Sequence, residues 1–292
     1  MDILEQAFAA ARRNPARVLL PEIDEPRVAE AAAQLTAQGL AEPVTLADAR
    51  PAEAYVDLLL RQRPGLKPAL ARRMLEKPLI RAAAMVAAGQ AEALVAGATH
   101  PTRRVIEAAA LAIGMEDGVA TPSSFFVMRL PDGRSLIFAD CAVTVAPDAA
   151  QLADIARASA ASARALLGTA RLALLSFSTG ASGSGASVTR VRDAAEALRA
   201  EGLDALGPVQ ADAALNPAIA AKKGLDASEA ANVLVFPDLD AGNIGYKLVQ
   251  ELAGAQAIGP FLQGFARPVC DLSRGASARD IVAATVLTLA RA

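Results

Sequence analysis

The sequence predicts an α/β protein built on parallel β-sheets, and two observations support this fold class. Short apolar runs alternate with alanine-rich stretches of helical periodicity along the 292 residues, which is typical of parallel sheets covered by helices on both faces. Hydrophobic residues make up 53% of the chain and charged residues 21%. The chain can therefore bury a sizeable core and is not disordered.

The N-terminal part of the chain shows this alternation directly, and one segment interrupts it. Two strand-like runs, 123–130 and 134–143, are joined by Pro131-Asp132-Gly133, which is a strong tight-turn sequence. We therefore expect one antiparallel hairpin within an otherwise parallel architecture. Before the hairpin, strands are expected at 17–20, 42–46 and 92–97, helices at 26–39 and 102–113, and two or three helices within 51–89.

The alternation resumes after the hairpin. No fixed-period repeat and no long linker divides the chain, so composition alone locates no domain boundary. Strands are expected at 172–177, 233–236 and 256–258, and helices at 148–167, 188–202, 243–254 and from 278 to the end.

Charge and residue usage exclude several classes of protein. The formal net charge is -2 and aromatic residues make up 3%, which argues against nucleic-acid binding. Cys141 and Cys270 are too few for a disulfide framework or a zinc site, and with His100 as the only histidine no histidine-based metal site is expected. The first residues predict an amphipathic helix and no signal peptide. The most apolar stretch, 281–289, is too short to span a bilayer, so we expect a cytoplasmic protein without membrane contacts.

A loop rich in glycine and serine, 178–187, is a candidate anion-binding site. Its glycines let main-chain N–H groups turn toward a ligand, and the N-terminus of the following helix favours an anion. The spacing matches neither a P-loop nor the dinucleotide fingerprint, and a flexible linker is the competing interpretation. Its position after a strand favours a phosphate or acyl-phosphate cradle. The candidate residues are Ser178, Thr179, Gly180, Ser182, Gly183 and Ser184.

Several other polar residues give weaker signals. Asp240 or Asn243 is expected mainly to cap the helix after the strand at 233–236. His100 follows a strand end, where a lone histidine is more often structural than functional. Cys141 is expected inside a strand as part of the core. Neither cysteine has a nearby base in the sequence, which gives little support to a covalent mechanism.

The segment before the last helix holds a hydroxyl, a cation and a carboxylate. Ser277 and Asp280 have the spacing of N-cap and N3, a capping box with Asp in place of Glu or Gln. Ser273 and Arg274 come just before them, either as a polar turn or as groups that stabilise negative charge during a reaction. Spacing alone favours capping for Asp280 and leaves catalysis open.

A series of short runs, strongest from Ala93 onward, resembles one known family over nearly the whole chain. The runs are Leu-Val-Ala-Gly-Ala at 94–98, Phe-Ala-Asp-Cys-Ala-Val at 138–143, Leu-Ser-Phe-Ser-Thr-Gly at 175–180, Gly-Pro-Val-Gln-Ala-Asp-Ala-Ala at 207–214, Val-Phe-Pro-Asp-Leu at 235–239, Ile-Gly-Pro at 258–260 and Asp-Leu-Ser-Arg-Gly at 271–275. Their order is similar to that in the phosphate acetyltransferase family, which includes phosphate butyryltransferases.

The resemblance implies two α/β domains with an interdomain cleft, a fold like that of isocitrate and isopropylmalate dehydrogenases. The first domain would be discontinuous, 1–118 plus 261–292, and the second would be 119–260. The implied protein is a homodimer with its active site in the cleft. The implied reaction transfers acetyl reversibly between coenzyme A and inorganic phosphate, giving acetyl phosphate. It needs no metal or bound cofactor, since coenzyme A is a substrate.

The resemblance also implies catalytic roles. Asp280 matches the family aspartate that deprotonates the thiol. Ser273 would hydrogen-bond the developing anion, and Arg274 would neutralise phosphate and transition-state charge. A helix N-terminus lowers the pKa of a carboxyl group and weakens it as a base. Either burial raises the pKa of Asp280, or Arg274 lowers that of the thiol.

Substrate-binding arginines are implied in the first domain, which looks shortened. Arg61, in a Leu-Arg context, resembles one of them. A second family arginine falls where this chain has Glu107, a reversal of charge, and Arg103 or Arg104 about one turn earlier is the expected substitute. The family's usual Asn before Asp271 is a cysteine here.

We expect direct transfer in a ternary complex, because nucleophile and base for an acyl-enzyme are poorly supplied. Two alternatives stay open. One is a phosphate acyltransferase for butyryl or another short acyl group. The other is a non-catalytic acetyl-CoA-sensing domain, which the joint presence of Ser273, Arg274 and Asp280 disfavours.

Overall fold

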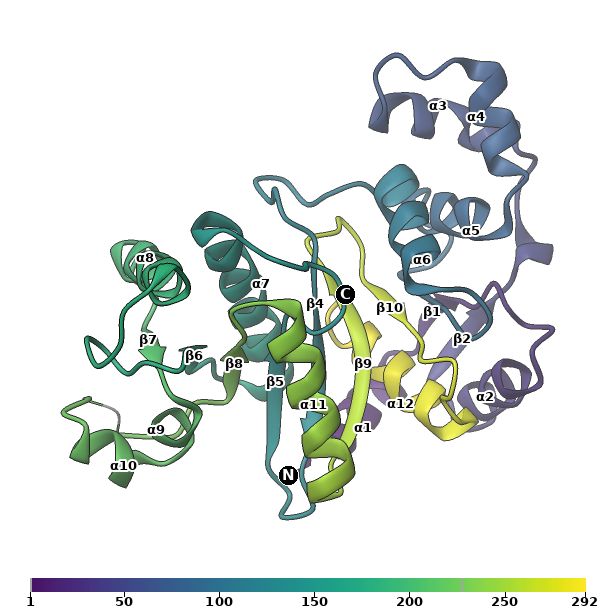
Figure 1. Ribbon diagram of the computed structural model, residues 1–292. Coiled ribbons are helices and arrows are strands. Elements are labelled where there is room, and N and C mark those ends of the chain that lie inside the picture. Colours follow the sequence, from purple (N-terminus) through teal and green to yellow (C-terminus); the bar gives the residue numbers. More distant parts are fainter. Residues whose placement is uncertain (1, 227) are drawn as a thin grey trace. The chain divides into compact units, whose positions relative to one another are not determined.

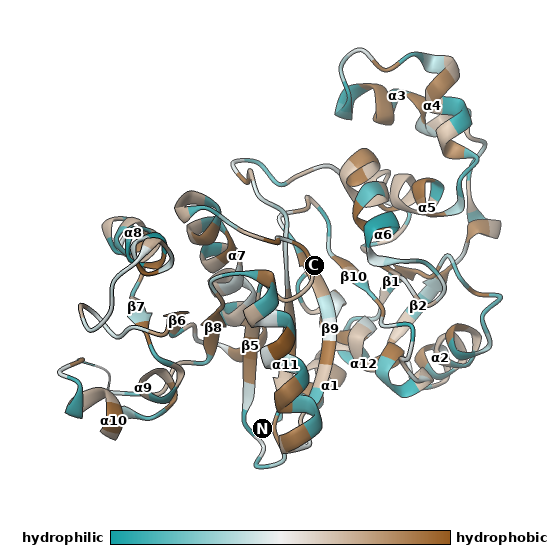
Figure 2. Ribbon diagram, in the orientation of Figure 1, coloured by the Kyte–Doolittle hydropathy of each residue, from teal (hydrophilic) through white to brown (hydrophobic). Residues whose placement is uncertain are grey.

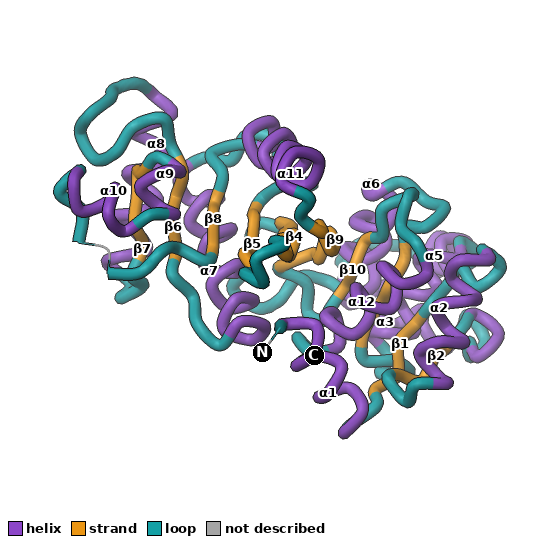
Figure 3. Tube along the Cα trace, turned by 90° about the horizontal axis from the view of Figure 1, so that it is seen from below, coloured by secondary structure: helices purple, strands orange, loops and turns teal. Residues whose placement is uncertain are grey.

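The computed structural model describes residues 2–226 and 228–292. The chain divides into two compact units (Figure 1). Unit 1 is the chain up to Val119 together with Ile258–Ala292, and unit 2 is Ala120–Ala257. Strands and helices alternate within both units, so the predicted α/β class is confirmed (Figure 3).

The sheet of unit 1 is mostly parallel. Its order is β2-β1-β3-β10-β9, with β9 antiparallel to β10 and the others parallel. Strand β10 comes from the far end of the chain and pairs directly with β3. The loops after β1, β3 and β10 therefore leave from the same edge of the sheet. The bounds are β1 Ala16–Leu19, β2 Ala41–Val44, β3 Ala93–Ala96, β9 Gln256–Gln263 and β10 Val269–Asp271.

Helices surround this sheet, and several begin with a proline. Proline at the first helical position costs no hydrogen bond and fixes a helical φ, and α2, α4 and α5 all start this way. Helix α12 packs against α1 and α2. The bounds are α1 Ile3–Arg13, α2 Pro26–Ala37, α3 Glu53–Gln62, α4 Pro68–Leu75, α5 Pro78–Ala87, α6 Thr102–Ala108 with a π-helical turn at Ala109–Ile113, and α12 Ala278–Leu289.

Unit 2 contains the predicted hairpin. Strands β4 and β5 pair antiparallel, with Phe126 opposite Phe138, while β5, β8, β6 and β7 follow in order as parallel neighbours. The bounds are β4 Ser123–Arg129, β5 Ser135–Ala139, β6 Leu172–Leu175, β7 Ala205–Val209 and β8 Val233–Val235. The helices are α7 Ala149–Leu167, α8 Ala186–Ala200, α9 Ala211–Leu215, α10 Pro217–Lys222 and α11 Leu239–Ala253.

The start of α11 corrects one prediction. Asp238 is the N-cap, and its side chain accepts a hydrogen bond of 2.9 Å from the main-chain N–H of Ala241. The expectation that Asp240 or Asn243 caps this helix is wrong, because the helix begins earlier than its apolar pattern indicates. Asn243 instead donates from Nδ2 to the carbonyl of Cys141, at 3.1 Å.

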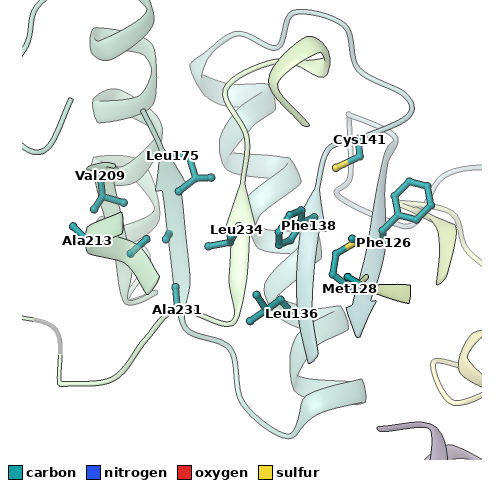
Figure 4. Close-up of a cluster of buried hydrophobic side chains, with 13 residues drawn as sticks. Phe126, Met128, Leu136, Phe138, Cys141, Leu175, Val209, Ala213, Ala231 and Leu234 are labelled. Carbon is teal, nitrogen blue, oxygen red and sulfur yellow. The ribbon is translucent and has the colours of Figure 1, made fainter. Parts of the chain in front are cut away.

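One core cluster of unit 2 lies on one face of its sheet. Phe138, Leu234 and Leu175 come from neighbouring strands and point into one cluster (Figure 4). The ring of Phe126 stacks on that of Tyr246 from α11, with 4.3 Å between centroids. Cys141 is buried in this cluster. Its core role is therefore confirmed, although it lies just past the end of β5 and not inside a strand.

Three elements of unit 2 and one strand of unit 1 were not expected from the pattern: β7, α9, α10 and β10. Strand β7 contains Gly207-Pro208, a dipeptide that predicts a turn. It is the last strand in the order, and an edge position tolerates proline. Strand β10 has only three residues and shows no alternation. Within the described residues, no helix combines the length and the apolar character that a membrane crossing requires.

Candidate active site

The loops that follow three parallel strands of unit 1 meet at the carboxyl edge of its sheet. Asp271 at the end of β10 pairs in register with Ala96 of β3. The main-chain N–H of Leu272 then donates to the carbonyl of Ala96 at 2.6 Å. In open α/β sheets ligands bind outside the carboxyl ends of the strands. The segment that holds Ser273 and Arg274 starts at this edge.

Arg27 fastens the Ser273–Arg274 loop to the rest of the edge. Its Nη1 donates to the carbonyl oxygens of Arg274 and Ala276, both at 2.8 Å. Its Nε donates to Glu25 at 2.7 Å. Ser273 and Arg274 are themselves exposed, so the loop is fixed through its main chain while its side chains face solvent.

Asp280 completes the predicted capping box at the start of α12. Its Oδ2 accepts from the main-chain N–H of Ser277 at 3.0 Å and from the Ser277 hydroxyl at 2.7 Å. In return the main-chain N–H of Asp280 donates to that hydroxyl at 3.2 Å. The capping role is therefore confirmed. Asp280 is half-buried and lies in the first turn of α12, the helix that follows the Ser273–Arg274 loop.

A buried carboxylate, Glu22, organises the loop after β3. Oε2 accepts from the main-chain N–H groups of Gly97 and Ala98, at 2.7 and 2.9 Å. Oε1 accepts from the main-chain N–H and the hydroxyl of Thr99, at 2.9 and 2.6 Å, and lies 2.7 Å from His100 Nδ1. Burial alone raises the pKa of Glu22, but these hydrogen bonds outweigh it and lower the pKa below its ordinary value.

A second buried carboxyl group, Asp271, lies beside it with far fewer partners. Its Oδ2 accepts a short hydrogen bond from the Thr102 hydroxyl at the start of α6. Its Oδ1 is buried and has no hydrogen-bond partner among the described residues. Burial raises the pKa of Asp271 to about 7, and the charge of Glu22 acts in the same direction. Neither acid was predicted to be functional, and Asp271 was singled out only as part of the Asp-Leu-Ser-Arg-Gly run.

The arginines proposed to bind substrate lie on two helices of unit 1. Arg103 Nε donates to Glu107 at 2.7 Å, and Arg104 Nη1 lies 3.7 Å from the same carboxylate. The reversed charge at Glu107 is thus offset by two cations on its own helix. Arg61 lies in the last turn of α3, which Figure 1 places well apart from α12. Helix α3, which carries Arg61, is therefore separate from the helix that follows the Ser273–Arg274 loop.

A pocket of about 600 Å³ opens in unit 1 between α4, α5 and α6. Apolar side chains from these helices form much of its wall, including Met74, Leu79 and Ile106. Arg63, Lys77 and Arg104 add positive charge, and His100 and Glu107 also line it. An apolar wall with several cations suits an elongated ligand that carries phosphate groups.

In unit 2, the 178–187 loop is held together by its own hydroxyls. Gly183 N donates to the Ser178 hydroxyl at 2.8 Å, and Thr179 N donates to the Ser182 hydroxyl at 2.9 Å. Thr179 Oγ1 also accepts from Gln210 N at 3.1 Å. Ser178 and Thr179 are buried, whereas Ser182 and Ser184 are exposed. These hydrogen bonds give the loop a defined conformation. Helix α8 starts after it at Ala186 without a side-chain cap.

No reactive thiol or metal centre is found among the described residues. Burial raises the pKa of Cys270 to about 12, and it raises that of Cys141 well above the ordinary value. Within the same residues, no three His, Cys, Asp or Glu side chains are grouped so that they could hold a metal ion. His100 Nδ1 pairs with Glu22 Oε1, which agrees with the structural role expected for this residue.

Comparisons with known proteins agree on one family. A sequence profile described as "Phosphate acetyl/butaryl transferase" matches residues 48–289. A phosphate acetyltransferase of Paracoccus denitrificans is 40% identical over 313 residues, covering 99% of this chain and 98% of that protein. One of Haemophilus influenzae is 41% identical over 317 residues, covering 98% of this chain but 44% of that protein. The solved EutD phosphotransacetylase from Staphylococcus aureus matches with a TM-score of 0.88 at 35% identity, covering 99% of this chain and 97% of that one. The chain belongs to the phosphate acetyl/butyryl transferase family.

Proposed function

We propose that this protein is a phosphate acetyltransferase, which moves an acetyl group reversibly between coenzyme A and inorganic phosphate. Family membership supports the reaction. The observation that supports the site is the Ser273–Arg274 loop, which is fixed through its main chain by Arg27 and is followed by the Asp280 carboxyl group in the first turn of α12. A cation, a hydroxyl and a carboxylate are thereby presented together at a sheet edge.

The chemistry requires each of these groups. When the thiolate attacks acetyl phosphate, negative charge develops on the carbonyl oxygen and leaves with phosphate. Arg274 neutralises that charge, and the Ser273 hydroxyl donates to the developing oxyanion. Asp280 accepts the proton of the thiol and returns it in the reverse direction.

The transfer is direct, with both substrates bound at once. An acyl-enzyme would need an accessible nucleophile, and both cysteines are buried with raised pKa values. Initial-rate kinetics test this step. A ternary complex gives double-reciprocal lines that intersect, whereas parallel lines would indicate a covalent intermediate.

We assign coenzyme A to the unit 1 pocket. Its apolar wall suits the pantetheine arm, and Arg63, Lys77 and Arg104 suit the phosphates. Arg103 pairs with Glu107 at 2.7 Å and Arg104 lies farther from it, at 3.7 Å, so we assign Arg104 to the ligand. Arg61 lies in the last turn of α3, two residues before Arg63 of the pocket wall, and we assign it as a further cation for the phosphates.

We assign anion binding to the loop of unit 2. The hydroxyls of Ser178, Thr179 and Ser182 shape the loop. Ser184 and the main-chain N–H groups at the uncapped start of α8 then face a phosphate group of the substrate. Gly180, with φ of +56°, makes the turn that this shape needs.

We further propose a homodimer that forms through α11. Ile244, Leu248 and Leu252 are four residues apart on this helix and are 57%, 52% and 82% exposed, and Figure 2 shows hydrophobic segments along it. Lys247 and Glu251 lie on the same helix. Two copies of α11 that pack antiparallel bury the apolar residues and pair these opposite charges. We also infer a cytoplasmic location, and the two buried, free cysteines support it because they suit a reducing compartment.

The deciding experiment is formation of acetyl-CoA from acetyl phosphate and coenzyme A by the purified protein, run beside the butyryl substrates. Turnover with acetyl at least as fast as with butyryl supports the assignment. A preference for the butyryl substrates would indicate a phosphate butyryltransferase. The absence of turnover with either acyl group would contradict the proposed enzymatic activity.

A further inference from the structure

We propose that Asp271 is a positioning residue for the Ser273–Arg274 loop, and that it acts as a neutral acid joining the end of β10 to the start of α6. The proposal rests on the acetyltransferase function assigned above, since Asp271 works by fixing how Ser273 and Arg274 are presented. It touches neither substrate.

The unequal surroundings of two buried acids carry the proposal. Glu22 is in contact with four N–H or O–H donors and with His100. Asp271 has one donor, the Thr102 hydroxyl, and its Oδ1 is buried without a hydrogen-bond partner among the described residues. A buried charge that lacks donors is penalised far more than a buried neutral group. The negative charge therefore belongs on Glu22 and the proton on Asp271.

The close approach of Gly97 shows how tightly Asp271 is held. A Cβ placed on Gly97 would lie 2.3 Å from Asp271 Oδ1 and 2.7 Å from the main-chain nitrogen of Leu272. Asp271 thus rests on the main chain at the end of β3. Through Thr102 it also contacts the first residue of α6, the helix that carries Arg104. One side chain links three segments of the proposed site.

The charged and titratable groups around Asp271 set the direction of its pH response. Glu22 faces it from the loop after β1, with His100 hydrogen-bonded to Glu22, and Cys270 precedes it on β10. Arg27 contacts the Ala98 carbonyl at 3.4 Å. Burial and the charge of Glu22 raise the pKa of Asp271 to about 7, against the hydrogen bond from Thr102. Above that pH Glu22 and Asp271 are both negatively charged and repel each other. This repulsion weakens the contacts through which Asp271 holds the Ser273–Arg274 loop.

Asp271→Asn tests the neutral role, because the amide has the same shape and carries no charge at any pH. We expect the wild-type kcat to decline above about pH 7, and the Asn variant to lack this decline while its kcat stays within about threefold of wild type at pH 6. Thr102→Val removes a hydrogen bond that lowers the pKa of Asp271, so its decline should move to higher pH. An Asn variant that melts like wild type but loses more than about tenfold in kcat at pH 6, or that keeps the wild-type pH profile, would overturn the proposal.

Unfolding stability supplies a readout that needs no catalysis. A carboxyl group whose pKa is raised in the folded protein stabilises it below its unfolded pKa near 4, and this contribution is lost as the pH rises through about 7. The wild type should therefore lose stability relative to Asp271→Asn across this window. If wild type and Asp271→Asn have the same dependence of unfolding stability on pH, Asp271 is not protonated in the folded protein, even if the enzyme is active. An inactive wild type with diverging profiles would reject the proposed function and leave the protonated Asp271 in place.

Discussion

We assign the Asp280 carboxyl group a chemical role in addition to its structural one. Its Oδ2 closes the capping box with Ser277, so replacing it affects both helix stability and, by our assignment, proton transfer. The two effects differ in size. A lost N-cap contact costs about 1 kcal/mol, whereas a lost general base lowers the rate by roughly 100- to 10,000-fold.

The pair Asp280→Asn and Ser277→Ala separates these roles. Asp280→Asn removes the negative charge but keeps an amide oxygen that can accept from Ser277, whereas Ser277→Ala removes the hydroxyl of the capping box and keeps the carboxylate. We expect Ser277→Ala to lower the melting temperature, and only Asp280→Asn to lower kcat by about 100-fold or more. If both variants lose kcat by the same small factor, Asp280 caps the helix and takes no part in proton transfer.

Two neighbouring arginines on α6 offer a similar comparison. Arg104 lines the unit 1 pocket, whereas Arg103, 87% exposed at its side chain, pairs with Glu107. Arg104→Ala should raise KM for coenzyme A about tenfold with little change in kcat, since it removes binding shared by the ground and transition states. Arg103→Ala should have a smaller effect on KM. If wild type and Arg104→Ala have equal KM values for coenzyme A, the assignment of coenzyme A to this pocket is wrong.

At this scale the sequence predicted local features better than distant ones. The spacing of Ser277 and Asp280 predicted the capping box. The Glu22–Asp271 arrangement could not be predicted, because Glu22, Thr99, Thr102 and Asp271 come from separate parts of the chain and meet only when β1, β3 and β10 pair. Nothing in the spacing of a lone acid indicates how many donors it will meet.

At the level of elements, the end of β3 depends on Gly97. Its φ is +110°, and an added Cβ would meet Asp271 and the main chain of Leu272. Gly97→Ala should therefore destabilise the protein by more than the roughly 1–2 kcal/mol of a left-handed non-glycine residue. It should also lower kcat, because the Ser273–Arg274 loop must shift.

Gly89→Ala is the matched control for that prediction. Gly89 also has a positive φ, +75°, but an added Cβ there meets nothing within 4 Å. Chemical denaturation and kcat are measured for both variants, and we expect Gly97→Ala to be the more destabilised and the less active of the two. Equal effects would show that the contact between β3 and β10 is not tight.

The elements divide into those with a periodic pattern and those without one. Helix α7 and strand β4 were predicted nearly to their bounds, and the Pro-Asp-Gly turn predicted the hairpin, although β5 ends at Ala139 and not at the expected 143. Strand β7 was missed because Gly207-Pro208 predicts a turn. Strand β10 was missed because three residues show no period, although pairing with β3 defines it.

At the level of the whole molecule, the apolar row on α11 predicts association of two copies. Leu248→Glu places charge in the middle of that row and should shift the protein from dimer to monomer in light scattering at micromolar concentration. Leu70→Glu is the control, since Leu70 on α4 is also exposed, at 49%. A wild type that is monomeric, or a Leu248→Glu variant that remains dimeric, would contradict the α11 interface.

The central claim is that the loop after β10 performs acetyl transfer, and acetyl-CoA formation by three proteins tests it most directly. Arg274→Ala removes the proposed transition-state cation. Arg279→Ala removes another exposed arginine five residues further on, at the start of α12. We predict that the wild type is active, that Arg279→Ala stays within about threefold of it, and that Arg274→Ala is slower by roughly 100- to 1000-fold. A folded Arg274→Ala variant with wild-type kcat would contradict the account.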